Sequence, residues 1–369
     1  MPAVNLGYML TDGHEALAGV AAAFPTVRFI RIDDDDALGR HAPELEVLLT
    51  VGFRYTASAA KILRDGAPAL KWIQWANAGI DTLLRHGIPP GVAVTYAPTV
   101  WGPTVAEHAV AMLLGLARRF PDLERDRAAA AWNRADRAAA MVSLDGMLVL
   151  CLGFGAIGRS AAQRLRPFGA RIVAFARSAR QDPDAEAILG LDRLDDFLPQ
   201  ADAVVIALPS APGCRGLLDR RRLASMKPSA ILINVARGDI VDEDALADAL
   251  SAGRLSGAGL DVFSTEPLPS DRRLWRAPNT ILSPHLGGYG GKAYERLADL
   301  LRTNLERYLS GRTLLHPIVR EDDAPPGDVT IRGSASPRPC GTGPCRRSWR
   351  PDRTNIRSPS RRLGDRPDR

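Results

Sequence analysis

Short apolar runs alternate with amphipathic stretches along most of this chain. The apolar runs have the length and composition of buried parallel strands, and the stretches between them show helical spacing of apolar residues. Such alternation is typical of parallel sheets whose strands are joined by crossover helices. It predicts two α/β units, with strands at residues 4–9, 27–32, 46–51, 71–76 and 92–97 in the first and at 147–152, 171–176, 203–208, 230–235, 257–263 and 280–285 in the second.

Helices are expected in the connections between these strands. The spacing of apolar residues predicts helices over 57–66 and 80–87. A longer helix starts near Gly102, where Pro103 suits the first turn because an N–H group there has no intrahelical partner.

Length, composition and charge favour an ordinary globular protein. The chain has 369 residues, 46% of them hydrophobic, which is enough for about two domains with substantial cores. Its formal charge of +6 is concentrated after residue 319, where 12 basic residues face 7 acids, leaving 48 − 12 = 36 basic and 42 − 7 = 35 acidic residues before it. The nearly neutral body argues against nucleic acid as a partner. Residues 320–369 are expected to be disordered, and the alternative is an arginine-rich arm for a polyanion.

The cysteines and the N-terminus exclude further classes. Cys151 and Cys214 lie in or beside apolar runs and are expected to be buried thiols, while Cys340 and Cys345 lack the second ligand pair of a zinc site. We therefore predict no metal. The chain has no basic residue before Arg28 and no long apolar run, so we expect a cytoplasmic protein that does not enter a membrane.

A glycine-rich loop is the most informative segment. In "GFGAIG", Gly153, Gly155 and Gly158 follow an expected strand and open a helix. The first glycine permits a tight turn, the second allows a pyrophosphate to approach the backbone, and the third lets helix and strand pack closely. The pattern predicts a dinucleotide cofactor bound at the start of this helix.

The next strand ends without the acid that usually binds the adenosine ribose of NAD. Ala176 stands at that position and is followed by Arg177, Ser178 and, two residues later, Arg180. Without a carboxylate, a 2′-phosphate is not repelled, and the arginines and the hydroxyl suit its charge. We expect NADP(H) to be preferred, with NAD(H) possible. The alternative is that Arg177 only points to solvent.

Ionisable groups follow three more expected strands. Arg237 and Glu266 come after the strands at 230–235 and 257–263, and His285 is the last residue of the strand at 280–285. Asp261 lies near the end of the strand at 257–263. Hydride transfer to a 2-oxo acid needs a proton donor near neutral pH, which a histidine beside a carboxylate provides. An arginine holds the substrate carboxylate through two parallel hydrogen bonds. These residues predict reduction of a carbonyl.

Taken in order, "GFGAIG", "NVARG", "GLDVFSTEP" and "PHLGG" resemble the D-isomer-specific 2-hydroxyacid dehydrogenases, a family that includes glyoxylate and hydroxypyruvate reductases. The resemblance covers most of residues 45–316. It implies an oxidoreductase acting on CH–OH donors, and a small 2-oxo or 2-hydroxy acid as its substrate. The residues that it implies or that the motifs indicate are, for catalysis, Arg237, Glu266 and His285; for substrate binding, Ala78, Gly79 and Arg237; and for the cofactor, Thr104, Gly153, Gly155, Ala156, Ile157, Gly158, Arg177, Ser178, Arg180, Pro209, Ala236, Asp261 and Gly288.

The resemblance also implies an architecture. Two Rossmann-like, doubly wound parallel-sheet domains would enclose an active-site cleft. A flavodoxin-like substrate domain would comprise residues 1–100 and 287–319, including a helix within 292–311, and an NAD(P)-binding Rossmann domain residues 101–286. Members of the family commonly form homodimers through the helix at Pro103 and the arm around Trp132.

Some points stay open. Ala211 and Cys214 stand where relatives often have threonines, and Glu266 argues against formate dehydrogenase activity, for which glutamine is typical. Three aromatic residues are candidates either for a substrate pocket or for the core, namely Phe53, Trp75 and Trp101. The alternative function is an NAD(P)-sensing binding protein resembling a corepressor. The sequence does not identify the acid.

Overall fold

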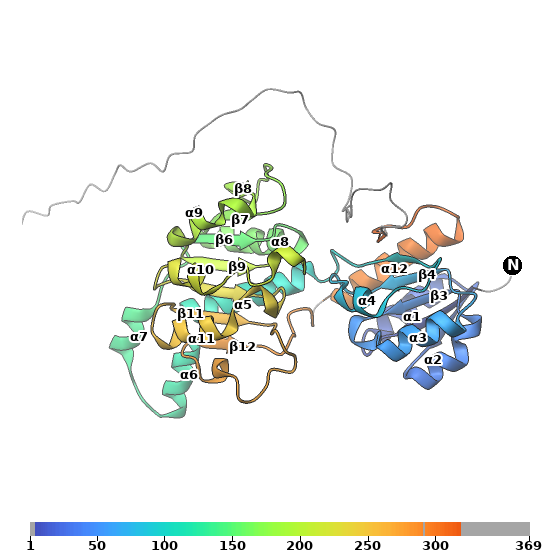
Figure 1. The fold of residues 1–369 in the computed structure, drawn as a ribbon, viewed down its shortest axis with the longest axis horizontal. Coiled ribbons are helices and arrows are strands. Elements are labelled where there is room, and N and C mark those ends of the chain that lie inside the picture. Colours follow the sequence, from blue (N-terminus) through green and yellow to red (C-terminus); the bar gives the residue numbers. More distant parts are fainter. Residues whose placement is uncertain (1–3, 291, 319–369) are drawn as a thin grey trace, which may run out of the picture. The chain divides into compact units, whose positions relative to one another are not determined.

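Two parallel β-sheets, one after the other along the chain, organise this computed structural model, which describes residues 4–290 and 292–318 (Figure 1). The first sheet has the strand order β2-β1-β3-β4-β5. Its interior strands are buried on both faces, as expected where crossover helices cover a parallel sheet. Its strands are β1 (Val4–Met9), β2 (Val27–Arg31), β3 (Val47–Thr50), β4 (Trp72–Trp75) and β5 (Ala93–Thr95).

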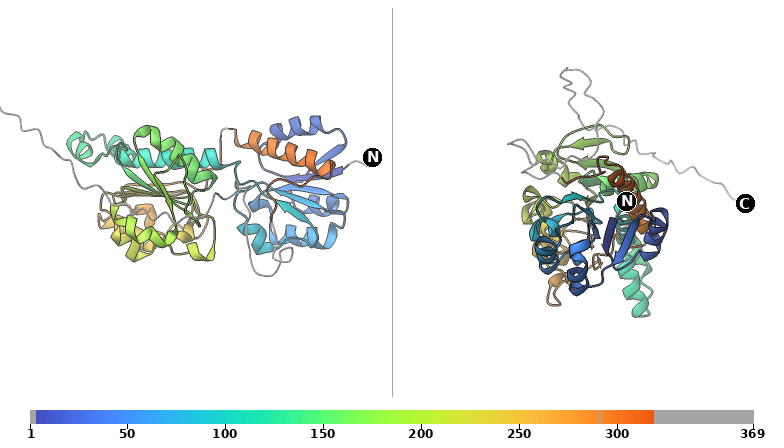
Figure 2. Two further views of the ribbon diagram at one scale, coloured as in Figure 1. Left: turned by 90° about the horizontal axis from the view of Figure 1, so that it is seen from above. Right: turned by 90° about the vertical axis from the view of Figure 1, so that its right-hand side faces the viewer.

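Helices from both ends of the described chain cover this sheet. α1 and α12 pack together on one face through Leu17, Val20 and Leu301, while α2 and α3 pack on the other through Leu38 and Leu63. Figures 1 and 2 show α12, in orange, lying beside the blue helix α1. The helices are α1 (His14–Ala23), α2 (Asp35–His41), α3 (Ala57–Gly66), α4 (Asp81–His86) and α12 (Ala293–Leu309).

The second sheet has the strand order β12-β11-β10-β9-β6-β7-β8. The order reverses between β6 and β9, and ligands of open α/β sheets bind outside the carboxyl ends of the strands at such a point. The parallel register pairs Ile231 with Gly257 and Ala258 with Thr280, so β10, β11 and β12 end side by side. The strands are β6 (Leu148–Leu152), β7 (Arg171–Phe175), β8 (Ala187–Leu189), β9 (Ala203–Ile206), β10 (Ile231–Asn234), β11 (Gly257–Leu260) and β12 (Thr280–Leu282).

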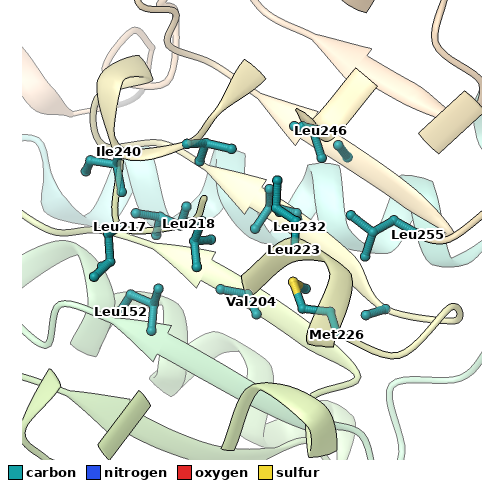
Figure 3. Close-up of a cluster of buried hydrophobic side chains, with 14 of the residues drawn as sticks. Leu152, Val204, Leu217, Leu218, Leu223, Met226, Leu232, Ile240, Leu246 and Leu255 are labelled. Atoms are coloured by element: carbon teal, nitrogen blue, oxygen red, sulfur yellow. The ribbon is translucent and has the colours of Figure 1, made fainter. Parts of the chain in front are cut away.

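Each face of the second sheet has its own core. α5 and α8 cover one face, and α10 and α11 contribute to the other, where Leu223, Met226 and Leu246 meet Val204 and Leu232 of the strands (Figure 3). The α-helices are α5 (Gly102–Ala117), α6 (Phe120–Ala128), α7 (Arg134–Ala140), α8 (Ala156–Leu165), α9 (Leu194–Phe197), α10 (Arg220–Ser225) and α11 (Glu243–Ser251). Short 3₁₀ turns are η1 (Ala42–Glu44), η2 (Gly52–Arg54), η3 (Arg166–Phe168), η4 (Leu191–Arg193), η5 (Leu198–Gln200), η6 (Pro212–Cys214), η7 (Gly238–Ile240) and η8 (Arg273–Arg276).

The prediction of two parallel-sheet α/β units is confirmed, with differences in detail. The expected strands at 257–263 and 280–285 end at Leu260 and Leu282, and β8 was not predicted. β12 ends three residues before the predicted end, and His285, the last residue of the predicted strand, has a left-handed backbone with φ of 56°, which no strand residue adopts. Cys151 and Cys214 are buried free thiols, as expected.

Several expectations are not tested by the described residues. The basic tail after residue 319, with Cys340 and Cys345, lies outside them, and so does its alternative as an arginine-rich arm for a polyanion. The proposed domain boundaries and the cytoplasmic location stay predictions. Within residues 4–290 and 292–318, no helix has the length and apolar character needed to cross a bilayer.

Candidate functional site

The glycine loop connects β6 to α8 at the point where the strand order reverses. Gly153 has φ of +96°, and a Cβ there would lie 2.4 Å from the carbonyl oxygen of Ala207. A Cβ on Gly158 would lie 2.0 Å from the oxygen of Gly153, so helix and loop touch. At Gly155, by contrast, a Cβ would meet nothing within 4 Å.

This geometry fits a dinucleotide cofactor. Gly155 is the N-cap of the ten-residue helix α8, and no side chain caps it. The first N–H groups of the helix, from Ala156 and Ile157 onward, are therefore available to an anion at its positive end. The open space at Gly155 is where the sequence places the pyrophosphate.

Gly153→Ala tests the loop without any ligand. We expect it to lower the free energy of unfolding by about 2 kcal/mol or more, because alanine is strained at this φ and its Cβ would overlap Ala207. Gly155→Ala is the matched control, since its backbone is extended and its Cβ would meet open space. Urea unfolding of both variants measures the difference, and equal stabilities would contradict the strained loop.

His285 and Glu266 form a close pair just beyond β12 and β11. His285 Nδ1 lies 2.8 Å from Glu266 Oε2, and Glu266 Oε1 accepts a hydrogen bond of 2.9 Å from the N–H of Phe263. The hydrogen bond with Glu266 raises the pKa of His285 above its ordinary value of 6.5 and outweighs burial. Burial alone would raise the pKa of Glu266, but the bonds from His285 and Phe263 hold it below its usual range. The pair therefore favours a protonated imidazole beside a carboxylate.

Arg237 extends from the end of β10 to the loop after β4. Its Nε and Nη2 donate to Asp81 Oδ2 over 3.1 and 2.6 Å, and its Nη1 donates to the carbonyl of Ala236 over 2.6 Å. A Cβ on Gly79 would lie 1.8 Å from Arg237 Nη2, so a larger residue at this position would make the guanidinium shift. The structure thus brings Arg237 against Gly79, which the sequence assigned to the same substrate carboxylate.

Asp81 is a site residue that the sequence analysis missed. Burial alone would raise the pKa of its carboxyl, but the charge and hydrogen bonds of Arg237, together with a bond from Ser210, hold it below its usual range. It follows Gly79 by two residues in "NAGID". An acid just beyond the end of a strand could have indicated a site residue from the sequence. Only the fold shows that Asp81 contacts an arginine 156 residues away.

The positive charge of Arg237 acts on both residues of this pair. It adds to the lowering of the pKa of Glu266 and opposes the rise in the pKa of His285. These three residues follow β10, β11 and β12, which are neighbours in the sheet. The predicted cation, carboxylate and imidazole therefore come together at one edge.

Asp261 has a structural task that the sequence did not indicate. It is 2% exposed, and its carboxylate accepts hydrogen bonds from Ser283 Oγ and from the N–H groups of Leu286 and Gly287, over 2.6, 2.8 and 2.9 Å. Its backbone oxygen accepts from the N–H of His285 over 2.9 Å. Burial alone would raise the pKa of this carboxyl, but His108, Ser283 and the two N–H groups hold it low. Asp261 thus shapes the turn that carries His285, and its contact with a nicotinamide stays a prediction.

The arginines after β7 lie beside the glycine loop. Arg180 Nη2 donates to the carbonyl of Phe154 over 2.8 Å, while Arg177 and Ser178 are exposed. Arg159, which the sequence analysis missed, lies over the ring of Phe154 at 5.9 Å and pairs with Asp182. Arg159 and Arg180 thus both contact Phe154 of the glycine loop, and the part of Arg177 at the adenosine end of the cofactor site stays a prediction.

The other predicted residues have contacts of their own in the structure. Thr104 Oγ1 accepts a hydrogen bond of 2.8 Å from Arg296, and a Cβ on Gly288 would lie 3.4 Å from the ring of Trp101. The carbonyl of Ala236 is bound to Arg237, Pro209 is exposed, and Ala78 precedes Gly79 in the half-buried loop.

The three aromatic candidates separate in the structure. Trp75 is fully buried and its indole N–H donates to the carbonyl of Gly79 over 2.8 Å, so it belongs to the core. Trp101 is half-buried and donates to the carbonyl of Ala76. Phe53 is 59% exposed and is the candidate that is free to contact a ligand.

Comparisons with known proteins match the family that the motifs resemble. The family model described as "D-isomer specific 2-hydroxyacid dehydrogenase, NAD binding domain" matches residues 110–287. D-3-phosphoglycerate dehydrogenase of Mycobacterium tuberculosis is 36% identical over 288 residues, which are 77% of this chain and 53% of that protein. The chain thus spans about half the length of these mycobacterial relatives.

Two further proteins match over most of their length. Glyoxylate reductase of Thermococcus kodakarensis is 34% identical over 255 residues, covering 67% of this chain and 76% of the reductase. A D-isomer specific 2-hydroxyacid dehydrogenase from Xanthobacter autotrophicus, solved with NADPH and MES, superposes with a TM-score of 0.71 at 27% identity and covers 86% of this chain and 98% of its own.

Proposed function

The chain belongs to the D-isomer specific 2-hydroxyacid dehydrogenase family, and from this premise we propose that it reduces a 2-oxo acid to the D-2-hydroxy acid with NADPH. The observation that carries the proposal is the pair of His285 and Glu266, 2.8 Å apart, beside the cation of Arg237. A protonated imidazole and a guanidinium at one strand edge suit a substrate that has a carboxylate and gains charge on its carbonyl oxygen.

The residues around the glycine loop fit the nicotinamide cofactor. The N–H groups at the start of α8 would hold its pyrophosphate, and Gly155 leaves the space for it. When bound, the reduced nicotinamide supplies the hydride, and the protein supplies orientation and charge stabilisation.

Arg237 is proposed to hold the substrate carboxylate together with the backbone of Ala78 and Gly79. A guanidinium has five N–H donors. Asp81 and Ala236 take three of them, which leaves 5 − 3 = 2 for the substrate. Asp81 fixes the plane of the guanidinium, so less entropy is lost when the acid binds.

His285 is proposed to give the proton to the carbonyl oxygen. Its Nδ1 is engaged by Glu266, which leaves Nε2 as the nitrogen that faces the substrate. Glu266 stabilises the imidazolium before transfer and keeps the ring in one orientation.

The preference for NADPH rests on the end of β7. Ala176 carries no charge there, Arg177 and Ser178 are exposed, and Arg180 is fixed to the loop through Phe154. The 2′-phosphate of NADPH is a partner for exposed cations at this place. The related enzyme from Xanthobacter autotrophicus was solved with NADPH, which supports the same choice.

Arg177→Ala is expected to weaken NADPH binding about tenfold to a hundredfold, the value of one hydrogen bond between charged groups, and to change NADH binding less than about twofold. Arg171→Ala is the matched control, because Arg171 begins the same strand and pairs with Glu186 on the surface. Fluorescence titration with each cofactor measures both effects. Equal losses for NADPH and NADH would refute the phosphate assignment.

We also propose that the protein is a homodimer. Phe120 begins α6, and Trp132 lies in the connection between α6 and α7; they are 59% and 91% exposed. The bonds of Arg137 with Asp126, over 2.6 and 2.7 Å, hold this hairpin together. A second copy of the chain would cover these rings. Sedimentation velocity should give a dimer, and the double variant Phe120→Ser, Trp132→Ser should shift it toward monomer. A monomeric wild-type protein would contradict this.

A substrate panel tests the proposed reaction. The full chain is mixed with NADPH or NADH and with glyoxylate, hydroxypyruvate, phenylpyruvate or phosphohydroxypyruvate, and oxidation is followed at the absorbance of the reduced ring. We expect turnover with at least one acid, faster with NADPH. No turnover with any acid would refute the proposal.

A further inference from the structure

A second glutamate lies behind the pair of Glu266 and His285. Glu243 is the first residue of α11, and its Oε1 accepts two hydrogen bonds of 2.6 Å, one from the N–H and one from the hydroxyl of Ser264. Two donors from one residue fix both the backbone and the side chain of Ser264. Neither motif analysis nor the proposed reaction gives Glu243 a role.

The bonds of Glu243 are not needed to cap its helix. Asp242 is the N-cap of α11, and its Oδ1 accepts from the N–H of Ala245 over 2.9 Å. An acid in the first turn is favourable near the helix dipole wherever it points. The direction of Glu243 toward Ser264 therefore has another cause.

The peptide that Glu243 holds is confined from another direction by Gly238. A Cβ on Gly238 would lie 1.9 Å from the carbonyl carbon of Phe263 and 2.1 Å from the nitrogen of Ser264. Gly238 directly follows Arg237 in the chain. The peptide between Phe263 and Ser264 is thus fixed relative to the segment that carries the proposed substrate arginine.

The same peptide leads into Glu266. The N–H of Phe263 donates to Glu266 Oε1 over 2.9 Å, and Glu266 Oε2 lies 2.8 Å from His285 Nδ1. Thr265 and Glu266 are otherwise on the exposed part of the loop, where few buried contacts restrain them. The position of Glu266 therefore depends on the Phe263–Ser264 peptide just before it, which Glu243 and Gly238 hold.

We propose that Glu243 is a positioning residue, whose carboxylate holds the Phe263–Ser264 peptide against Gly238 and so keeps Glu266 in hydrogen-bond reach of His285. This inference rests on the proposed function, because it assigns Glu243 to the same reaction. It differs from a general role in folding, since it predicts an effect on the protonation of His285.

The charges that face His285 come from three elements. Glu266, after β11, and Asp261, at the end of β11, raise the pKa of His285, while Arg237, after β10, lowers it. His108 of α5 lies behind Asp261, with its Nε2 3.4 Å from Asp261 Oδ1. We expect a loop released at Ser264 to displace Glu266, which follows it by two residues, so that the protonated state of His285 becomes less favoured.

Titration of His285 by NMR of the imidazole rings is the decisive experiment, with His285→Asn identifying its signal among the 6 histidines of the full chain. We expect Glu243→Ala to lower the pKa of His285, Ser264→Ala to lower it less, and Glu243→Gln, which keeps an oxygen acceptor, to stay near wild type. Asp244→Ala is the matched control, because Asp244 lies in the same turn and its nearest cation, Arg272, is 3.9 Å away. Unchanged titration of His285 in both Glu243→Ala and Ser264→Ala would overturn the proposal.

A kinetic measurement links the proposed positioning role of Glu243 to the reaction. In Glu243→Ala, kcat/KM for reduction at pH 8 should fall about tenfold, which corresponds to about 1.4 kcal/mol, and the fall should be smaller at pH 6. Affinity for NADPH should stay within about twofold of wild type. A loss equal at both pH values would indicate a structural role and overturn the proposal. If the wild-type protein reduces no 2-oxo acid, the proposed function fails, whereas the titration of His285 still decides the role of Glu243.

Discussion

Replacing His285 with alanine is expected to lower kcat for reduction about 10²- to 10⁴-fold, because the proposed proton donor to the carbonyl oxygen is then missing. The affinity for NADPH should change less than about twofold, since the loop at Gly153 and the start of α8 are untouched. Initial rates and fluorescence titration measure the two effects. His41→Ala is the matched control, because His41 Nδ1 pairs with Glu44 at the same 2.8 Å distance, far along the chain from the site residues.

The pH profile gives a second test of His285. In the proposed reaction His285 acts in its protonated form, and its pKa is raised above 6.5 by Glu266. The rate should therefore be level at acidic pH and fall as pH rises through the raised value. Glu266→Gln removes the partner charge and should move this fall to lower pH. A fall at the same pH in both proteins, or a full rate in His285→Ala, would remove His285 from the mechanism.

Arg237→Ala is expected to lower kcat/KM about 10²- to 10⁴-fold, because two hydrogen bonds to a carboxylate are lost and each is worth about 1.5–3 kcal/mol. Arg237→Lys should recover only part of this, since an ammonium cannot bind Asp81 and a substrate carboxylate in one plane. Steady-state kinetics across substrate concentrations measure the loss.

Arg215→Ala serves as the control for Arg237. Arg215 also pairs with an aspartate, Asp239, over 3.2 Å, but it is 73% exposed. Surface pairs of this kind contribute little, so its variant should keep its rate. Equal rates for Arg237→Ala and wild type would remove the guanidinium from substrate binding.

Much of the fold could be predicted from the alternation of apolar and amphipathic segments. β1 and α3 have the bounds that the pattern predicted. β1 is a short, mostly apolar run and α3 has apolar residues at helical spacing, and these patterns indicate both the type of element and its length. The three-residue strand β8 could not be predicted, since "AIL" between polar loops becomes a strand only by pairing with β7. The ends of β11 and β12 were also missed, because the turns that stop them depend on Asp261 binding N–H groups of the His285 loop.

The part of the candidate site that lies in sequence motifs could be predicted. Arg237, Glu266 and His285 follow strands in motifs, so their meeting at one sheet edge could be expected from parallel topology. The contacts of Asp81, Glu243 and Arg159 could not be predicted, because each side chain meets a partner distant in the sequence and no spacing rule connects the two.

The register of β10, β11 and β12 has a practical consequence for engineering. Arg237, Glu266 and His285, the proposed catalytic residues, follow β10, β11 and β12 in turn. A slip of one residue in the pairing of any of these strands would move the residue that follows it by about 3.3 Å and turn alternate side chains to the opposite face. Libraries that seek new substrates should therefore keep these strands and their lengths constant. Substitutions are better introduced at positions such as Phe53, which is exposed and lies outside these three strands.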